Sequence, residues 1–478
     1  MTLFLISLAV LIGGYFTYGL LVERVFGVDS SRTTPAYAMR DDIDYLPLPA
    51  WKVFLIQFLN IAGLGPIFGA IMGIMFGPAA FLWIVLGTIF AGAVHDYFSA
   101  MISLRQGGAS LPEIVGNELG SSIKQVMRVF SLLLMILVGA VFVINPADLL
   151  AGMTPDHLDR MFWVIAIFVY YILATLLPID KLIGNIYPVF GAALLFMALG
   201  LIGYMVFNWV DIPDGLTDGL YNRSVDPEST PVFPMMFVSI ACGAISGFHA
   251  TQSPMMARCL KNEKLGRPIF YGAMVSEGIV ALIWAAAAIA FTGGYQGLDD
   301  YMASHGNLPA PLVNDISIGW LGTVGGVLAM LGVIAAPITT GDTALRSARL
   351  IAADFLKIDQ RTILRRLMVS VPIFLAAFGV MMIDFSVLWR YFGWCNQALA
   401  CFTLWGITVY LARRQKPWII TLAPALFMTT VCVSYLLFSP SLGLGLSYNV
   451  SVSLGIAVSA ALTVIFFWKK SSLKASDD

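Results

Sequence analysis

Long apolar runs separated by short polar stretches dominate the hydrophobic pattern of this chain. A helix needs about 20 mainly apolar residues to cross a membrane, and thirteen segments reach that length. They cover 2–22, 54–77, 80–104, 125–147, 161–179, 184–206, 234–257, 268–293, 319–343, 366–384, 388–411, 417–438 and 446–468. The pattern therefore predicts an all-α polytopic membrane protein, with the lipid bilayer as its surroundings.

Two of these segments contain helix-breaking residues in their middle. The segment 54–77 is interrupted at 62–66, and the segment 234–257 is interrupted at 243–249. Unpaired backbone groups are costly at membrane depth and persist only where they are buried in protein or line a watery cavity. Glycines that serve only close helix packing are the alternative explanation. We favour genuine breaks, because matched interruptions in two halves of a transporter indicate its binding site.

The two interrupted segments open two similar groups of helices. Residues 53–206 and 234–411 each hold five predicted helices, so the second group starts from the opposite side of the membrane. This is the pattern of an inverted-topology repeat. Outside it lie an extra helix and cytoplasmic loop over 1–52, an external loop over 207–233, and two extra helices with a cytoplasmic tail over 412–478.

Basic residues alternate between the two sides of this arrangement. With the N-terminus outside and the C-terminus in the cytoplasm, 24 of the 27 Lys and Arg residues fall on the inside. The exceptions are Arg160, Arg223 and Arg390. A bias of this kind sets the orientation of membrane proteins and supports the predicted helix count. The basic stretch 346–366 can be a charged helical extension of the preceding segment along the cytoplasmic face, but a solvated anchor on that side is the favoured interpretation.

Composition narrows the function further. Only 12% of residues are charged and the mean hydropathy is +0.85, whereas soluble domains carry about 25% charged residues. The net charge of −1 and the lack of a basic stripe argue against a nucleic-acid partner. No phosphate-binding glycine loop or His-Glu-x-x-His motif is present. An intramembrane hydrolase built on Ser246 and His249 has far less support than a transporter, so no enzyme is expected.

The ends of broken helices have a chemical polarity. Free N–H groups near Pro66 and Pro254 suit a carboxylate, because helix N-termini carry positive partial charge. Pro254 is expected in a first helical turn, with Ser253 as its cap. Free carbonyls near Ala62 and Gly243 suit a cation. The predicted substrate-binding residues are Gln57, Asn60, Gly63, Gly65, Ser246, Gly247, His249 and Thr251.

Three carboxylates lie inside predicted helices, where a charge costs at least ~2.5–3.5 kcal/mol. Asp342 has three threonines beside it, whose oxygens suit a hard cation or a proton; a salt bridge to Arg346 at i+4 is an equally weighted alternative. Glu277 is expected to hydrogen-bond a broken-helix backbone. The predicted coupling residues are Asp342, Thr339, Thr340, Thr343, Asp96, His95 and Glu277.

Several motifs resemble the carbon starvation protein A (CstA) family. They are 35–45, 61–67, 92–97, 246–250 and 339–346. The resemblance implies the five-plus-five inverted-repeat fold of amino-acid and neurotransmitter symporters, the LeuT/APC-like fold. It implies transport of peptides, or proton-coupled transport of pyruvate. By similarity to the wider fold, it also places a possible Na⁺ site at Ala62, Thr339 and Thr340.

Two departures from the family bear on this expectation. Many members are longer and carry more C-terminal helices. Many also have histidines just before the first break, where this chain has Ile56 and Gln57. Substrate specificity or ion coupling is therefore expected to differ from those members.

We accordingly predict a cation-coupled transporter, with H⁺ favoured over Na⁺, in the cell inner membrane. Its substrates are expected to be short peptides or small carboxylates such as pyruvate, and no cofactor is expected beyond the coupling ion. The alternatives are a Na⁺-coupled amino-acid symporter and a passive channel or nutrient sensor.

Overall fold

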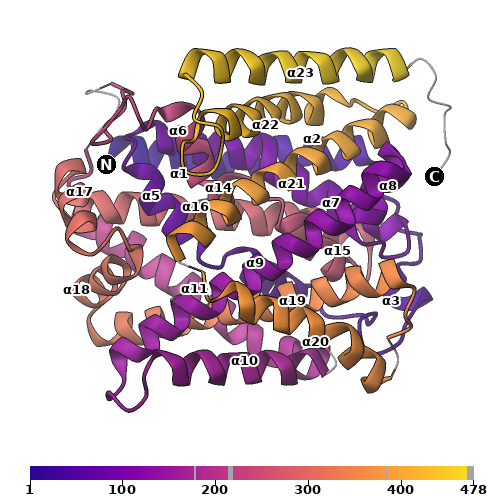
Figure 1. Cartoon of the computed structure of the whole chain (residues 1–478), viewed down its shortest axis with the longest axis horizontal. Helices are drawn as coiled ribbons and strands as arrows, with labels where there is room; N and C mark the ends of the chain where they lie inside the picture. Colours follow the sequence, from indigo (N-terminus) through magenta and orange to yellow (C-terminus); the bar gives the residue numbers. More distant parts are fainter. Residues whose placement is uncertain (177–178, 214–218, 361, 384, 471–478) are drawn as a thin grey trace.

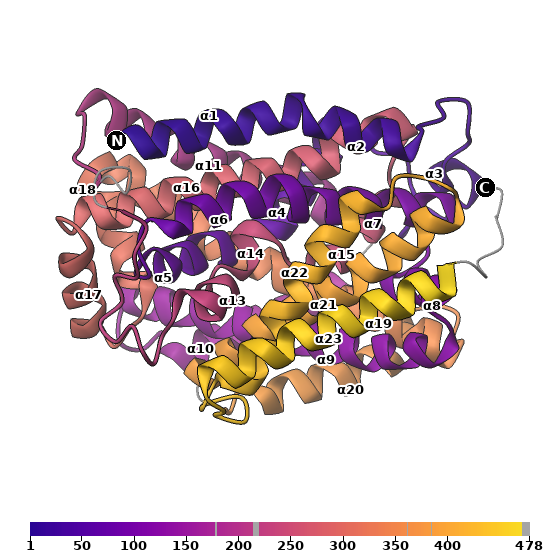
Figure 2. The same cartoon turned by 90° about the horizontal axis from the view of Figure 1, so that it is seen from above.

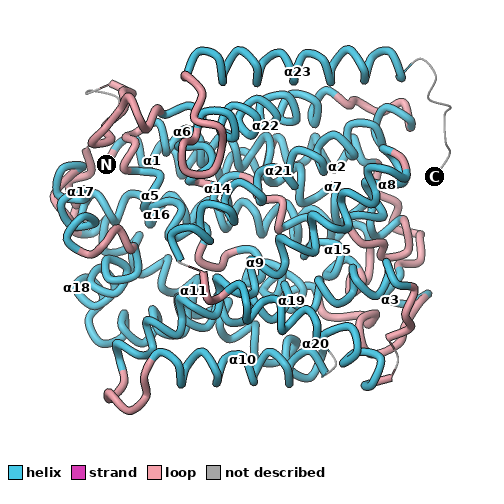
Figure 3. Tube along the Cα trace, in the orientation of Figure 1, coloured by secondary structure: helices cyan, strands magenta, loops and turns pink. Residues whose placement is uncertain are grey.

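The computed structural model of the chain describes residues 1–176, 179–213, 219–360, 362–383 and 385–470. Within those ranges the chain forms helices joined by turns and loops, and no strand is present (Figure 3).

The first half of the chain holds eleven α-helices and two short π-helical turns. They are α1 (Thr2–Phe16), α2 (Tyr18–Phe26), α3 (Pro35–Ala38), α4 (Ala50–Ile61), η1 (Gly65–Gly69), α5 (Ala70–Ile74), α6 (Ala79–Gly87), η2 (Thr88–Gly92), α7 (Ala93–Arg105), α8 (Leu111–Leu119), α9 (Ser121–Met153), α10 (Arg160–Leu176) and α11 (Ile179–Phe207).

The second half continues in the same way. Its helices are η3 (Val232–Met236), α13 (Phe237–Ser239), α14 (Ala241–Ala244), α15 (His249–Ala257), η4 (Glu263–Leu265), η5 (Arg267–Tyr271), α16 (Gly272–Phe291), α17 (Tyr295–Ser304), α18 (Pro309–Ala329), η6 (Met330–Ile334), α19 (Ala335–Leu356), α20 (Ile363–Val380), α21 (Phe385–Arg413), α22 (Ile419–Phe438) and α23 (Tyr448–Lys470).

Glycines and prolines mark several of these boundaries for local steric reasons. Gly27 ends α2 with a left-handed φ of 73°, which costs little without a Cβ. Gly120 separates α8 from α9 with a φ of 100°. Pro35 begins α3, where its missing N–H would have no helical partner.

The described residues contain nine helices long and apolar enough to cross a membrane, or eleven if two bent pairs each count as one span. The bent pairs are Ala50–Ile61 with Gly65–Ile74, at 52°, and Pro309–Leu328 with Leu331–Leu356, at 57°. The shorter apolar helix α10 and the interrupted segment α13–α15 would complete the predicted thirteen.

The long helices run in one general direction, and the N-terminus and the last residue of α23 lie at opposite ends of the molecule (Figures 1 and 2). The N-terminus lies near α17 and α18, whereas α23 finishes at the opposite end of the molecule, which also holds α3 and α8. Helix α23 packs on α22 at the periphery, and α16 and α7 run through the interior. This arrangement leaves the two interrupted segments in the centre.

Two expectations about the segment after 309 are wrong. The predicted single helix over 319–343 is a bent pair; its second part continues to Leu356, in agreement with the alternative of a helical extension. Arg346 and Arg349, which were expected in a solvated anchor, are 0% and 1% exposed. Asp44, from the loop before α4, lies 3.7 Å from Arg346 and 3.9 Å from Arg349. Buried charges need such partners, so Arg346 and Arg349 are part of the packed interior, whereas Lys357 and Arg365 further along the stretch are exposed.

Candidate functional site

The first interruption leaves backbone groups without hydrogen-bond partners in the protein interior. Helix α4 ends at Ile61, and the chain resumes helical geometry at Gly65. Within the described residues, the amides of Gly63 and Leu64 and the carbonyls of Ala62 and Gly63 form no hydrogen bond. Pro66 lies in the first turn of the second half, as predicted. The break therefore offers both donors and acceptors.

Asn60 adds a polar side chain to this break. It is 0% exposed, and neither its Oδ1 nor its Nδ2 atom has a hydrogen-bond partner in the described protein. Buried amides are normally hydrogen-bonded, and an exception calls for an explanation. Asn60 and the free groups of 62–64 together form a set of fixed hydrogen-bonding positions suited to a small polar ligand.

The second interruption is closed by a neighbouring helix. The Oδ1 atom of Asn396, on α21, accepts hydrogen bonds from the Phe248 amide at 2.7 Å and from the Ser246 hydroxyl at 2.9 Å. The amide of Gly247 donates to the Asn396 carbonyl at 3.1 Å, and Gln397 donates to the Ile245 carbonyl at 3.2 Å. These contacts use the polar groups that a broken helix would otherwise expose.

This closure corrects the predicted anion site at the second break. Helix α15 begins at His249, so Pro254 lies inside it and Ser253 is not its cap. The Ser253 hydroxyl instead accepts a hydrogen bond from Gln57 on α4, at 3.0 Å. The free donors predicted near Pro254 are therefore absent, and those of the first break remain.

Glycines bring the two interrupted segments into direct contact. An ideal Cβ on Gly65 would lie 2.2 Å from the Cβ of Cys242, and one on Gly73 would lie 2.1 Å from Ile240. A Cβ on Gly69, midway between them, would lie 2.9 Å from the Ser239 carbonyl oxygen. Small residues spaced four apart allow membrane helices to approach closely. Gly65 thus has a packing role, and its predicted contact with substrate stays a prediction.

A buried cluster of two histidines and two carboxylates lies at the start of α15. The Nδ1 atom of His249 is 3.1 Å from Asp96, and its Nε2 atom is 3.5 Å from Glu277. The other carboxylate oxygen of Asp96 is 2.8 Å from the Nδ1 atom of His95. All four side chains are 0% exposed. Helices α7, α15 and α16 therefore place four ionisable groups in one row.

The geometry of the cluster leaves one predicted role open and changes another. The Nδ1 atom of His249 lies 3.1 Å from Asp96, whereas its Nε2 atom makes no hydrogen bond within the described residues, so the predicted contact of His249 with substrate stays a prediction. Glu277 was expected to bond the backbone of a broken helix, whereas its nearest polar partner is the His249 ring. Neither oxygen of Glu277 makes a hydrogen bond by the usual distance and angle limits. The cluster is suited to hold and move protons.

Asp342 has a different partner from those that the sequence indicated. The Tyr187 hydroxyl, on α11, donates to its Oδ2 atom, and its Oδ1 atom has no hydrogen-bond partner among the described residues. The nearby threonine hydroxyls donate to backbone carbonyls: Thr339 and Thr340 to Ala336, and Thr343 to Thr340. The protons of these hydroxyls are thus used by the backbone of α19, and the predicted coupling role of the three threonines beside Asp342 stays a prediction.

Thr340 nevertheless joins α19 to the first break. Its hydroxyl is 3.1 Å from the Leu59 carbonyl oxygen, and an ideal Cβ on Gly63 would lie 3.1 Å from the same hydroxyl. The remaining predicted residue, Thr251, donates to the Phe248 carbonyl at 2.6 Å. The possible Na⁺ site at Ala62, Thr339 and Thr340 stays a prediction.

The sequence interpretation missed Asn396, Gln397, Tyr187 and Asp44. The adjacent Asn396 and Gln397 stand in the middle of an apolar segment, and polar residues at that depth are functional candidates by default. That signal was sufficient to find them. Asp44 and Tyr187 carried no such signal, because their partners are distant in the sequence.

A helical fold with two interrupted segments in its interior and ionisable groups at one of them is typical of multi-pass membrane transporters. The family model of the carbon starvation protein CstA matches residues 1–156 and 151–320. This chain belongs to that family, whose named relatives are transporters rather than enzymes. It is accordingly a multi-pass protein of the inner membrane.

Relatives of different length match the chain. An uncharacterized membrane protein of Haemophilus influenzae is 43% identical over 348 residues, which are 63% of this chain and 94% of that protein. The pyruvate/proton symporter BtsT of Escherichia coli is 29% identical over 59% of this chain. The peptide transporter CstA of Bacillus subtilis is 28% identical over 60% of this chain. The matches cover 48% and 58% of those two transporters.

The manganese transporter of Eremococcus coleocola has a similar fold. The two structures superpose with a TM-score of 0.53 over 90% of this chain and 97% of the other, at 12% sequence identity. At that identity the likeness concerns the fold alone.

Proposed function

We propose that this protein is a proton-coupled secondary transporter that takes up short peptides or small carboxylates such as pyruvate. The observation that carries the proposal is the row of His95, Asp96, His249 and Glu277 beside two interrupted helices. Ionisable groups at membrane depth commonly form proton relays in transporters. The second interruption places one of these groups, His249, on a segment with little regular structure before it.

Proton coupling follows from the charges of this row. Two carboxylates that flank one imidazole repel each other unless a proton lies between them. Protonation of His249 offsets that repulsion, and loss of the proton restores it. The spacing of α7, α15 and α16 should therefore depend on whether a proton is bound.

Substrate recognition is assigned to the first interruption. The free amides of Gly63 and Leu64 and the Asn60 side chain are suited to a carboxylate, because fixed N–H groups bind anions without reorganisation. This assignment accords with the relatives that are named peptide transporter and pyruvate/proton symporter. Because this chain spans about half the length of those proteins, its substrate is a proposal of its own.

The proposed architecture is a five-plus-five inverted repeat with thirteen spans, an external N-terminus and a cytoplasmic C-terminus. The distribution of basic residues supports it, with 24 of 27 on the cytoplasmic side. The position of the N-terminus and of the last residue of α23 at opposite ends of the molecule accords with an odd number of spans (Figure 1).

Transport by purified protein in liposomes tests the proposal. An inward pH gradient should drive accumulation of labelled pyruvate or of labelled alanyl-alanine above equilibrium, and a protonophore should abolish it. Liposomes without protein supply the baseline. If neither compound accumulates under a pH gradient or a sodium gradient, the proposed function is wrong.

Sodium coupling is the second candidate, and one contact favours it. Thr340 lies against the Leu59 carbonyl next to the free carbonyl of Ala62, and oxygen ligands of this kind suit a hard cation. Accumulation that needs a sodium gradient and survives a protonophore would select this candidate. Accumulation that needs only the pH gradient would remove it.

A further inference from the structure

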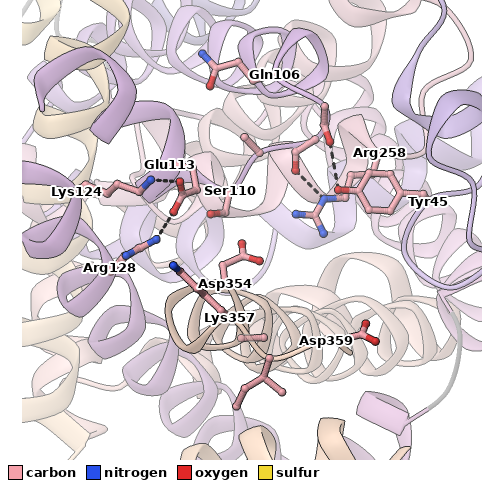
Figure 4. A pocket seen from close by; sticks show the side chains of 15 residues that line it. Tyr45, Gln106, Ser110, Glu113, Lys124, Arg128, Arg258, Asp354, Lys357 and Asp359 are labelled. Carbon is pink, nitrogen blue, oxygen red and sulfur yellow. Dashed lines mark hydrogen bonds and ion pairs between the residues drawn. The ribbon is translucent and has the colours of Figure 1, made fainter. Parts of the chain in front are cut away.

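A second polar site lies away from the interrupted helices, at the end of the molecule that holds α3 and α8. A cavity of about 680 Å³ opens there between α8, α9 and the last turn of α19 (Figure 4). Ligand pockets typically have volumes of ~300–1,000 Å³. Its charged lining residues are Glu113, Lys124, Arg128, Arg258, Asp354, Lys357 and Asp359.

Some of these charges already have partners within the protein. Glu113 contacts Lys124 and lies 2.5 Å from Arg128. Asp359 lies 3.2 Å from Arg365, outside the cavity lining. These pairs hold the cavity wall together, and their charges are largely offset.

Three charges remain for a ligand. Within the described residues, Arg258, Asp354 and Lys357 form no ion pair within 4.0 Å. Figure 4 shows the Asp354 carboxylate beside Ser110, with Arg258 and Lys357 on either side of it. A carboxylate between two cations is an unusual lining for a cavity that binds only anions or only cations.

Arg258 is held in place before any ligand arrives. Arg258 is 7% exposed. Its Nε atom donates to the Gly108 carbonyl at 2.9 Å, and its guanidinium group lies 5.0 Å from the centre of the Tyr45 ring. The Tyr45 hydroxyl donates to the Gly107 carbonyl at 3.2 Å. The two terminal guanidinium nitrogens make no hydrogen bond to described residues. These two nitrogens can bind both oxygens of a carboxylate through parallel hydrogen bonds.

We propose that this cavity binds a small zwitterion, such as a dipeptide or an amino acid. Arg258 binds its carboxylate and Asp354 binds its ammonium group, while Lys357 increases the positive potential at the mouth. A simple anion meets repulsion from Asp354, and a simple cation meets repulsion from Arg258 and Lys357. Two statements rest on the proposed function: that the cavity faces the cytoplasm, and that its ligand is also a transported peptide. The proposal that the cavity binds a zwitterion is independent of that function.

Calorimetric titration of the purified full-length protein tests the site. The probes are alanyl-alanine, its N-acetyl derivative, which lacks the ammonium group, and pyruvate. Asp354→Asn should weaken alanyl-alanine binding by about tenfold, the value of one charge-assisted hydrogen bond. It should leave binding of the other two probes unchanged or tighter. Asp300→Asn is the matched control, because Asp300 is exposed on α17 at the opposite end of the molecule, and it should bind like the wild type.

A second variant and a second background keep the test decisive. Arg258→Lys should weaken the binding of both alanyl-alanine and its N-acetyl derivative, because a single ammonium group replaces the two guanidinium nitrogens that bind the carboxylate. The same losses should appear in the Asn60→Ala background, which separates this cavity from the first break. Absence of alanyl-alanine binding, or equal affinities in wild type and Asp354→Asn, would overturn the proposal.

The outcomes also separate the two proposals. If liposomes accumulate no substrate but Asp354→Asn still loses alanyl-alanine binding, the transport function is wrong and the zwitterion site stands. If accumulation is observed and neither cavity variant changes binding, the zwitterion site is wrong and the transport function stands.

Discussion

At the scale of single residues, the position of His249 is the most informative about the coupling mechanism. It is fully buried, and its two ring nitrogens face carboxylates on two other helices. An imidazole in this position links Asp96 to Glu277, and it can accept a proton at one ring nitrogen while it donates one from the other. Its neighbours, rather than its place in a broken helix, determine its role.

His249→Gln should abolish accumulation driven by a pH gradient, because glutamine keeps polar contacts but cannot carry the proton. Exchange of labelled for unlabelled substrate across the liposome should continue, since exchange needs no net proton movement. His157→Gln is the control, because His157 is exposed on the loop after α9. If accumulation persists in His249→Gln, the cluster is not the coupling site.

Asp342 supplies a second residue-scale test. Asp342→Asn removes a buried charge but preserves a side chain that accepts from the Tyr187 hydroxyl. We expect accumulation to be lost or uncoupled from the gradient, with normal yield and thermal stability of the purified protein. Undiminished gradient-driven uptake by this variant would remove Asp342 from the mechanism.

At the scale of helices, the contact between the two interrupted segments depends on glycine. Gly65→Ala would force a methyl group into Cys242, whose Cβ lies 2.2 Å from the ideal position. We expect a loss of thermal stability or a shift toward a more open state, measured by unfolding temperature and by solvent access to Cys242. Gly203→Ala, on α11 with no atom within 4 Å of its ideal Cβ, should be neutral or stabilising by ~1 kcal/mol.

Asn396 tests how the second interruption is held. Asn396→Ala would leave the Phe248 amide and the Ser246 hydroxyl without this acceptor in a buried place, at ~1–3 kcal/mol for each unsatisfied group. The unfolding temperature of the purified protein should fall measurably. Asn117→Ala, an exposed site bonded to Gln106, should have little effect. Equal stability of the two variants would mean that the interruption does not depend on α21.

The helices and their interruptions could be predicted from sequence, whereas the partners of buried polar groups could not. The lengths of the apolar segments and the positions of glycine and proline within them located the break at 62–66 and the region of the break at 243–249. The local pattern around Ser253 and Pro254 was misleading, because the Ser253 hydroxyl is used by Gln57 on another helix. Contacts such as Asp44 with Arg346 join residues some 300 positions apart, and no local pattern encodes them.

At the scale of the whole molecule, the distribution of basic residues and the positions of the N-terminus and of the end of α23 predict how the protein is oriented in the membrane. The loop that holds α17 should face the outside, and the turn after α19 should face the cytoplasm. In a variant with its five native cysteines replaced, Asp300→Cys should react with a membrane-impermeant maleimide added to intact cells. Lys357→Cys should react only after the cells are opened. Both positions are at exposed parts of the surface, so burial would not explain a difference between them. The reverse labelling pattern would place the N-terminus inside. If both cysteines react from outside, the number of spans between them is even, and α18 and α19 do not cross the membrane as one bent span.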